Sequence, residues 1–187
     1  MARRELSRYP IEWLFPVVVL VVVFTVYPFG YAVWNSLHRI LLILPTQPFV
    51  GLKNYVDVVQ NIYFREALLN TLVFAAITAP VIVLIALGVA RLLLVEFVGR
   101  GVVRAVVLLP WAMPGLVSGI VWIWIFHGRW GILNALLLRL GIISAYIEWL
   151  DEPLLAKMSV MVAHVWTQIP FASVLLMSAL SIISKEL

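Results

Sequence analysis

Charged residues and histidines divide the sequence into long apolar stretches. None occurs in 13–37, 67–90 or 105–126, and His164 is the only one in 158–184. A transmembrane helix needs about 20 apolar residues, and a charge at mid-bilayer is costly enough to mark where helices end. The pattern therefore predicts four transmembrane helices over these ranges.

The composition agrees with a protein that resides in a lipid bilayer. Of the 187 residues, 64% are hydrophobic and 12% are charged, whereas a soluble domain is about 45–50% apolar and about 25% charged. A soluble globule of this length has too little interior to bury that much apolar surface, and disordered chains are poor in hydrophobic residues. We therefore expect an all-α integral membrane protein, with residues 1–187 in a single transmembrane domain.

The lysines and arginines predict the orientation in the membrane. One side would hold Arg3, Arg4, Arg8, Arg91, Arg100, Arg104 and Lys185, and the other Arg39, Lys53, Arg65, Arg129, Arg139 and Lys157. The first set lies in shorter segments, and a high density of such cations marks the cytoplasmic side. We expect both the N- and C-termini in the cytoplasm and segments 38–66 and 127–157 outside. The net charge of +4 then reflects orientation, and no basic stripe indicates nucleic-acid binding.

The two outside segments are rich in turn-forming and aromatic residues. They include Pro45, Pro48, Gly51, Gly128, Gly131, Gly141, Trp130, Tyr146 and Trp149, with an acidic cluster at Glu148, Asp151 and Glu152. Such segments are typical of surfaces at the level of the lipid headgroups. The alternative is that they dock a partner outside the membrane.

No motif in the sequence indicates enzymatic chemistry. The chain has no cysteine, no phosphate-binding loop and no His-Glu-x-x-His, and its three histidines lie in different segments. Ser118 lies in a Gly-Leu-Val-Ser-Gly sequence that differs from the Gly-x-Ser-x-Gly turn of hydrolases. We expect neither a catalytic residue nor a metal site.

Three features inside the predicted helices have alternative interpretations. His164 is either a donor or proton relay in a cavity or a neutral imidazole bonded to a neighbouring helix, and the lack of an acidic partner inside any helix favours the second. Gly115 and Gly119, four residues apart, are typical of close helix packing. Trp122 and Trp124 lie near a helix end, where tryptophans form interfacial belts.

Prolines interrupt the predicted helices at places suited to a solute pathway. Pro110 and Pro114 remove two backbone donors and predict a kink, and broken helices at depth line cavities in transporters. Pro170 follows the hydrogen-bonding residues Thr167 and Gln168, which aromatic residues flank. Aromatic faces with a few polar groups suit the binding of sugar rings. Tyr27-Pro28 lies near the far end of the first predicted helix, where a proline kink or break is tolerated.

A series of short motifs resembles the sugar-type permeases of binding-protein-dependent ABC transporters. In order, they are Val50–Tyr55, Ala67–Thr71, Gly99-Arg100-Gly101 with Arg104, Leu108–Pro114, Trp122–Phe126, Gly131–Asn134 and Asp151–Pro153. Each motif is weak by itself, whereas the ordered series is specific. The resemblance covers the chain from about residue 10 to its end and is to maltose, trehalose and glycerol-phosphate permeases.

The resemblance implies a function and a set of partners. The fold would be part of a type I ABC importer permease in the prokaryotic inner membrane, and the solute a sugar or a sugar-like compound. Partners would be a dimer of ATP-binding subunits that carry ATP and Mg, a second permease subunit and an extracytoplasmic solute-binding protein, so this chain would hold no cofactor. By position, the resemblance places Trp111, Gly115, Gln168 and Phe171 near the solute.

The resemblance also implies a continuation after the last residue. Leu180–Leu187 fits the stretch that precedes the cytoplasmic Glu-Ala-Ala coupling loop of such permeases, with Ser181 and Ser184 where Gln and Pro are usual. The chain is therefore expected to be incomplete at its C-terminus. The alternatives are a truncated permease that does not transport, a four-helix structural or assembly subunit without a solute path, and a proton-coupled transporter that uses His164.

Overall fold

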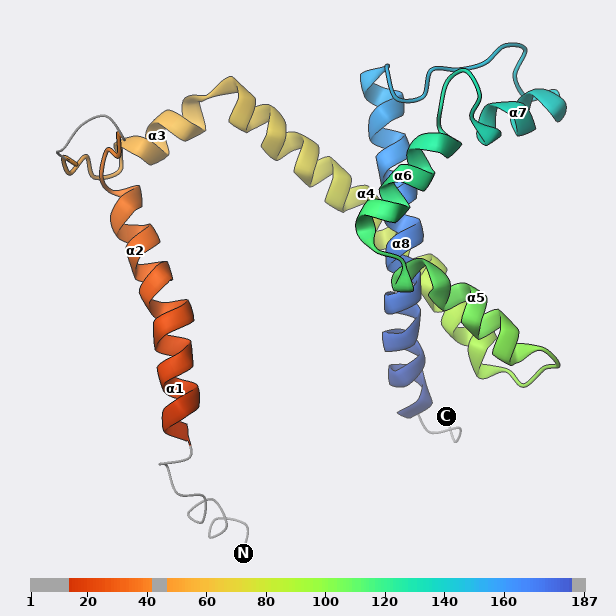
Figure 1. Cartoon of the computed structure of the whole chain (residues 1–187), viewed down its shortest axis with the longest axis horizontal. Coiled ribbons are helices and arrows are strands. Elements are labelled where there is room, and N and C mark those ends of the chain that lie inside the picture. Colours follow the sequence, from red (N-terminus) through yellow and green to blue (C-terminus); the bar gives the residue numbers. More distant parts are fainter. Residues whose placement is uncertain (1–13, 42–46, 183–187) are drawn as a thin grey trace, which may run out of the picture. The chain divides into compact units, whose positions relative to one another are not determined.

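The computed structural model describes residues 14–41 and 47–182 (Figure 1). The predicted helix ends at residues 13, 183 and 184, and most of the segment Leu180–Leu187, lie outside the described residues. The chain divides into two units, residues 1–69 and 70–187. They are considered in turn.

The first unit begins with one apolar helical stretch. α1 (Phe15–Val21), η2 (Val22–Val26) and α2 (Tyr27–Ser36) follow one another without a break and together make 22 residues. η2 is a π-helix, in which the N–H of Tyr27 donates to the carbonyl of Val22. Pro28 has no N–H, and a proline ring crowds the carbonyl four residues earlier. A local widening of the helix fits this crowding, and the helical stretch continues through Pro28.

α3 (Lys53–Gln60) is fastened to the end of α2. The side-chain amide of Asn54 donates to the carbonyls of Ser36 at 2.8 Å and His38 at 3.0 Å. The hydroxyl of Tyr55 donates to the Ser36 hydroxyl at 2.7 Å. Gly51 turns the chain into α3 with a φ of 58°, which favours glycine. The motif Val50–Tyr55 therefore has a structural role at the helix end.

α4 (Ile62–Leu94) begins in the first unit and ends in the second. It extends past the predicted range 67–90 at both ends, because charged side chains leave the apolar core without ending the helical hydrogen bonds. At its end, Arg100 Nε and Arg104 Nη2 donate to the carbonyl of Leu93 at 2.8 and 3.2 Å. A carbonyl in the last turn has no partner within its own helix, so the two arginines cap α4.

The predicted helix 105–126 is two helices in the structure. α5 (Arg100–Ala112) and α6 (Gly115–Ile125) are bent by 99° relative to each other. The expectation of one kinked helix is thus corrected to a broken pair. Met113 has extended backbone angles, as residues before proline do because the proline ring disfavours the helical conformation. Pro114, which has no N–H, then precedes α6.

The last two helices follow the turn after α6. α7 (Ile132–Arg139) lies within segment 127–157, and α8 (Pro153–Ile182) begins five residues before the predicted 158. The carboxylate of Glu152 accepts a hydrogen bond from the N–H of Leu155 at 2.8 Å. An acceptor in this place and a proline at the first helical position both favour a helix start. They explain why α8 begins before the apolar stretch does.

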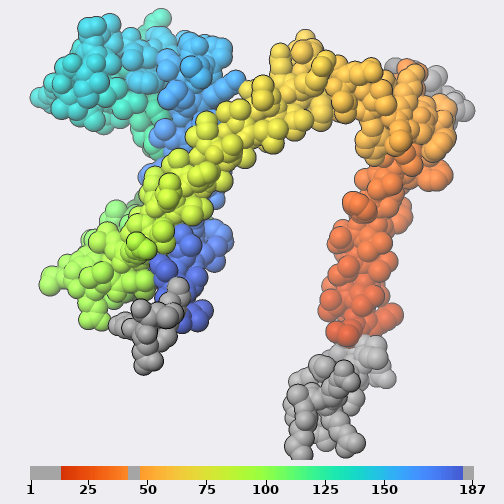
Figure 2. Space-filling view, turned by 180° about the vertical axis from the view of Figure 1, so that it is seen from behind, coloured from red at the N-terminus to blue at the C-terminus, as the bar shows by residue number. Residues whose placement is uncertain are grey.

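The helices match the fold class predicted from the sequence. The stretch Phe15–Ser36, α4 and α8 are each long and apolar enough to cross a membrane, and the bent pair α5–α6 makes a fourth crossing if it counts as one span. Most large apolar side chains of the described residues are exposed, as lipid-facing residues are. In the second unit, α4 passes across α8 (Figure 2). There, Lys157 Nζ donates to Asn70 Oδ1 at 2.8 Å.

Candidate functional site

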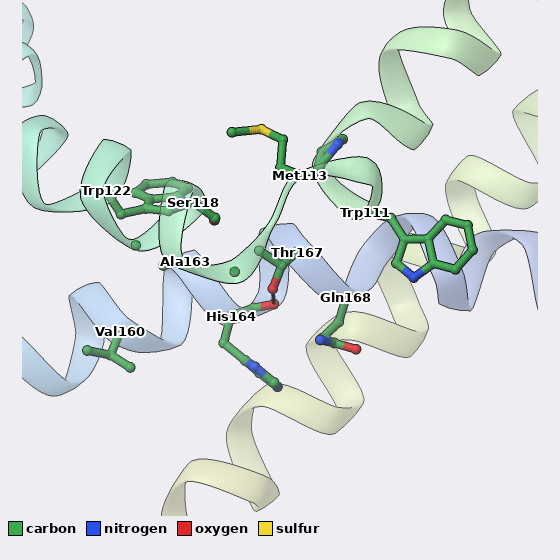
Figure 3. A pocket seen from close by; sticks show the side chains of 12 residues that line it. Trp111, Met113, Ser118, Trp122, Val160, Ala163, His164, Thr167 and Gln168 are labelled. Atoms are coloured by element: carbon green, nitrogen blue, oxygen red, sulfur yellow. Dashed lines mark hydrogen bonds between the residues drawn. The ribbon is translucent and has the colours of Figure 1, made fainter.

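The break between α5 and α6 forms a groove with α8 in the second unit. The groove has a volume of about 430 Å³. Its lining residues are Pro110, Trp111, Met113, Gly115, Ser118, Gly119, Trp122, Val160, Ala163, His164, Thr167 and Gln168. Figure 3 shows Trp122 and Ser118 toward one end, Trp111 toward the other, and His164 and Thr167 between them.

Helical periodicity builds two walls of this groove. Gly115, Ser118, Gly119 and Trp122 recur at intervals of three and four residues along α6. The α8 residues of the lining, from Val160 to Gln168, recur at the same intervals. Residues with this spacing share one face of an α-helix. The break at Met113-Pro114 turns the α6 face toward α8 and thus creates the space between them.

Among the described residues, the groove lacks the acidic and basic side chains that are ordinarily charged at neutral pH. None of its lining residues is Asp, Glu, Lys or Arg. The hydroxyl of Thr167 donates to the carbonyl of His164 within α8 at 2.8 Å. Within the described residues, the indole nitrogen of Trp122 is buried without a hydrogen-bond partner. The arrangement can offer neutral donors and acceptors between aromatic rings.

Four predicted solute residues lie at or beside this groove. Trp111, Gly115 and Gln168 line it. Phe171 is outside the lining but stacks on Trp111, with ring centroids 6.0 Å apart and ring planes inclined by 27°. The structure thus brings the four residues together, and their contact with a solute stays a prediction.

The predicted packing role of Gly115 and Gly119 also stays a prediction. A Cβ atom at either position would meet no other atom within 4 Å in the described part of the chain. Within the described residues, the two glycines therefore leave space on the α6 wall of the groove.

His164 lies in the groove, and its ring rests against a neighbouring helix. Its ring centroid is 5.1 Å from that of Phe74 on α4, with the ring planes inclined by 55°. A carboxylate partner, which a proton relay would use, is absent from the residues that line the groove. His164 is thus a polar group of the wall with an aromatic neighbour.

The sequence did not identify two residues of the groove as solute contacts. Trp122, expected in an interfacial belt, lines the groove, and its ring makes contacts with Trp166 at 5.6 Å and Phe126 at 5.3 Å between centroids. Ser118 is buried in the same wall. Ser118 and Trp122 lie three and seven residues after Gly115, a spacing that places all three on one face of a helix. The direction in which this face points depends on the 99° bend between α5 and α6.

Segment 127–157 has its own buried centre at Asn134. The side-chain amide of Asn134 donates to the carbonyls of Gly128 and Ile147 at 2.8 and 2.9 Å. Its oxygen accepts from the N–H of Ile147 at 3.2 Å and from the indole of Trp149 at 2.9 Å. These bonds hold α7 to the chain that leads into α8 and give the segment a defined shape.

A second hollow lies in segment 127–157 and the adjoining Phe126. It has a volume of about 240 Å³ and is lined by Phe126, His127, Gly128, Arg129, Glu148, Leu150 and Asp151. Both signs of charge occur there, which differs from the uncharged groove between the helices. The described residues contain no group of three or more His, Asp or Glu that could hold a metal ion.

Curated relatives of this sequence are permeases of transport systems. The chain is 33% identical over 174 residues to the trehalose/maltose transport system permease protein MalF of Thermococcus litoralis. It is 30% identical over 176 residues to the sulfoquinovosyl glycerol transport system permease protein SmoG of Agrobacterium fabrum. It is also 30% identical over 192 residues to the trehalose transport system permease protein SugA of Mycobacterium tuberculosis. No family model matches the chain.

These alignments cover nearly all of this chain but only part of each relative. They include 93%, 93% and 100% of this chain, and 58%, 56% and 58% of the respective relatives. The chain therefore spans less than two thirds of the length of the curated relatives it matches.

A solved structure has the same fold. It is the crystal structure of a bacterial ABC transporter involved in the import of the acidic polysaccharide alginate. The TM-score is 0.73 at 22% sequence identity, over 92% of this chain and 57% of the matched chain. The likeness shows a shared fold over most of this chain.

Proposed function

We propose that this chain, a multi-pass membrane protein homologous to the permease subunits of sugar ABC importers, lines the path of a sugar or sugar-like solute across the inner membrane. In this proposal the chain undergoes alternating access and performs no chemistry of its own. ATP and Mg bind to a separate dimer of ATP-binding subunits. A second permease subunit completes the pathway.

The groove between α6 and α8 is the observation that carries this proposal. It combines aromatic rings with uncharged polar groups, which suits the apolar faces and hydroxyl edges of a sugar. It also lies at a break in a membrane helix, where backbone groups can face a cavity instead of lipid. The homology to trehalose and maltose permeases supports the same solute class.

The orientation of the chain is part of the proposal. We place both termini and the segment between α4 and α5 in the cytoplasm, because Arg91, Arg100 and Arg104 gather there. Segment 127–157 then faces outward with its second hollow. A solute-binding protein would deliver solute from that side.

Solute-dependent ATPase activity of the assembled transporter tests the proposal. Replacing Trp111 by Ala removes a stacking surface, and we expect the half-saturating solute concentration to rise roughly tenfold. Replacing Gln168 by Ala removes one neutral hydrogen-bonding group, and we expect a rise of about two- to tenfold.

Two matched variants serve as controls for this experiment. Trp130 and Gln60 are exposed and lie outside the groove, so Trp130→Ala and Gln60→Ala should keep the half-saturating concentration of the parent. An unchanged half-saturating solute concentration in both Trp111→Ala and Gln168→Ala would show that the groove is not part of the solute path. ATPase activity without any response to solute would favour a structural subunit.

A further inference from the structure

The walls of the groove hold aromatic rings, polar groups and the imidazole of His164, whose ring packs against Phe74 of α4. Trp111 and Trp122 supply the rings, and the hydroxyl of Ser118 and the amide of Gln168 supply neutral donors and acceptors. Asp, Glu, Lys and Arg are absent from the described residues that line the groove. An anionic solute would therefore meet no lysine or arginine on these walls, and a cationic solute would meet no carboxylate.

The cations next to the groove in sequence are engaged elsewhere. Lys157 lies one turn before Val160 on α8, and its ammonium donates to Asn70 Oδ1 on α4 at 2.8 Å. Arg104 lies before Pro110 on α5, and its guanidinium donates to the carbonyl of Leu93 at 3.2 Å. Each cation already holds two helices together. Neither lines the groove.

The curated relatives differ in the charge that their names imply for the solute. Trehalose and maltose are neutral, whereas a sulfoquinovosyl group carries a sulfonate. An anion that loses water in a site without a compensating cation pays a large desolvation penalty. Neutral hydroxyls, by contrast, can exchange water for the amide and hydroxyl groups of such a wall.

We infer that the groove admits an uncharged, polyhydroxylated solute and discriminates against an anionic one. This inference rests on the proposed function and deepens it, because it specifies the charge class of the solute. Gln168 is the residue at which the preference is most easily changed. Its side chain is exposed in the groove, so an arginine at this position has room and supplies a cation.

A matched pair of probes tests the inference directly. Trehalose and trehalose 6-phosphate differ only in a phosphate, and both can be titrated into the full chain in nanodiscs of zwitterionic lipid. The chain has 8 tryptophans, so ¹⁵N-indole spectra are simple, and Trp111→Phe and Trp122→Phe assign the two groove resonances. Direct binding to this chain avoids any selection made by a solute-binding protein.

We expect trehalose to shift the resonances of Trp111 and Trp122 and to leave that of the exposed outer Trp130 unchanged. Trehalose 6-phosphate should bind at least about tenfold more weakly. Gln168→Arg should reduce or reverse the difference in affinity between trehalose and trehalose 6-phosphate, because the guanidinium pairs with the phosphate. The same substitution at Gln60, exposed on α3 outside the groove, should leave the difference unchanged.

The possible failures can be told apart. Binding of trehalose 6-phosphate as tight as that of trehalose to the parent chain would overturn the inference while leaving the proposed function intact. If Gln168→Arg and Gln60→Arg changed the difference in affinity between the two probes equally, the inference would also be overturned. The charge of the solute would then affect binding at a place other than the groove. Absence of any shift with either probe, together with unchanged ATPase half-saturation in Trp111→Ala and Gln168→Ala, would overturn both proposals.

Discussion

Trp111 on α5 stacks on Phe171 of α8, with 6.0 Å between ring centroids. This contact joins the helix before the break to the helix that forms the opposite wall of the groove. Arg104 and Met177 lie further along the same pair of helices, with 3.9 Å between Arg104 Nη2 and the sulfur. The position of the Trp111 ring thus depends on the packing of α5 against α8.

Phe171 should therefore affect solute binding through Trp111. We expect Phe171→Ala to raise the half-saturating solute concentration about two- to fivefold, because an aromatic pair contributes about 0.5–1.5 kcal/mol. In Trp111→Ala the additional change Phe171→Ala should have little effect, since the ring it supports is gone. ATPase titrations of the two single variants and the double variant measure this coupling.

A matched control for this cycle is Phe29→Ala. Phe29 is exposed on α2 in the first unit and does not line the groove. Its effect should add to that of Trp111→Ala without coupling. Additive effects of Phe171→Ala and Trp111→Ala would show that Phe171 does not position Trp111.

The buried amide of Asn134 should be essential for the fold of segment 127–157. Asn134→Ala removes four hydrogen bonds and leaves the Trp149 indole and the backbone of Ile147 without these partners. Buried polar groups that lose their partners cost about 1–3 kcal/mol each, so we expect a loss of roughly 3 kcal/mol in unfolding free energy. Thermal unfolding in detergent and limited proteolysis at residues 127–157 measure the effect.

Asn61→Ala is the control for Asn134→Ala. The side chain of Asn61 is exposed and accepts one hydrogen bond from the N–H of Tyr63 at 2.9 Å. Its loss should cost about 1 kcal/mol or less. Equal destabilisation by the two changes would contradict a central role for Asn134.

Gly131 should tolerate no side chain. A Cβ atom at this position would overlap the backbone carbonyls of His127 and Ile125, and a backbone cannot move aside as a flexible side chain can. We expect Gly131→Ala to lower the unfolding free energy by about 2 kcal/mol or more. Chemical denaturation followed by tryptophan fluorescence would measure the change.

Gly101→Ala is expected to change the unfolding free energy in the opposite direction. Gly101 lies within α5, and a Cβ atom there would meet nothing within 4 Å. Alanine is the better helix former, so the variant should gain about 0.5–1 kcal/mol. A similar loss of stability in both variants would mean that the contacts around Gly131 are not responsible.

Sequence reasoning located the membrane helices because charges are expelled from the bilayer core. It missed both ends of α4 and the start of α8, because helical hydrogen bonds continue where apolar residues stop. Arg65 and Glu66 bounded the predicted range 67–90, yet α4 begins at Ile62. Glu152 and Pro153 form a helix start that depends on capping and is independent of hydrophobicity.

The groove was only partly predictable for a different reason. The prolines indicated where a helix breaks, and the resemblance indicated Trp111 and Gln168. The angle of the break decides which residues of α6 face α8, and a one-dimensional pattern does not contain that angle. Trp122 was consequently assigned to the lipid interface, although the 99° bend brings it into the groove.

The orientation in the membrane can be tested because the chain contains no cysteine. Val98 is fully exposed between α4 and α5, and Ile142 is exposed after α7. If the dense cations at Arg91, Arg100 and Arg104 mark the cytoplasmic side, Val98→Cys should react with a membrane-impermeant maleimide only after the cells are opened. Ile142→Cys should react in intact spheroplasts. Labelling of the two positions from the same side would contradict a membrane crossing by α5–α6, and the reverse pattern would invert the proposed orientation.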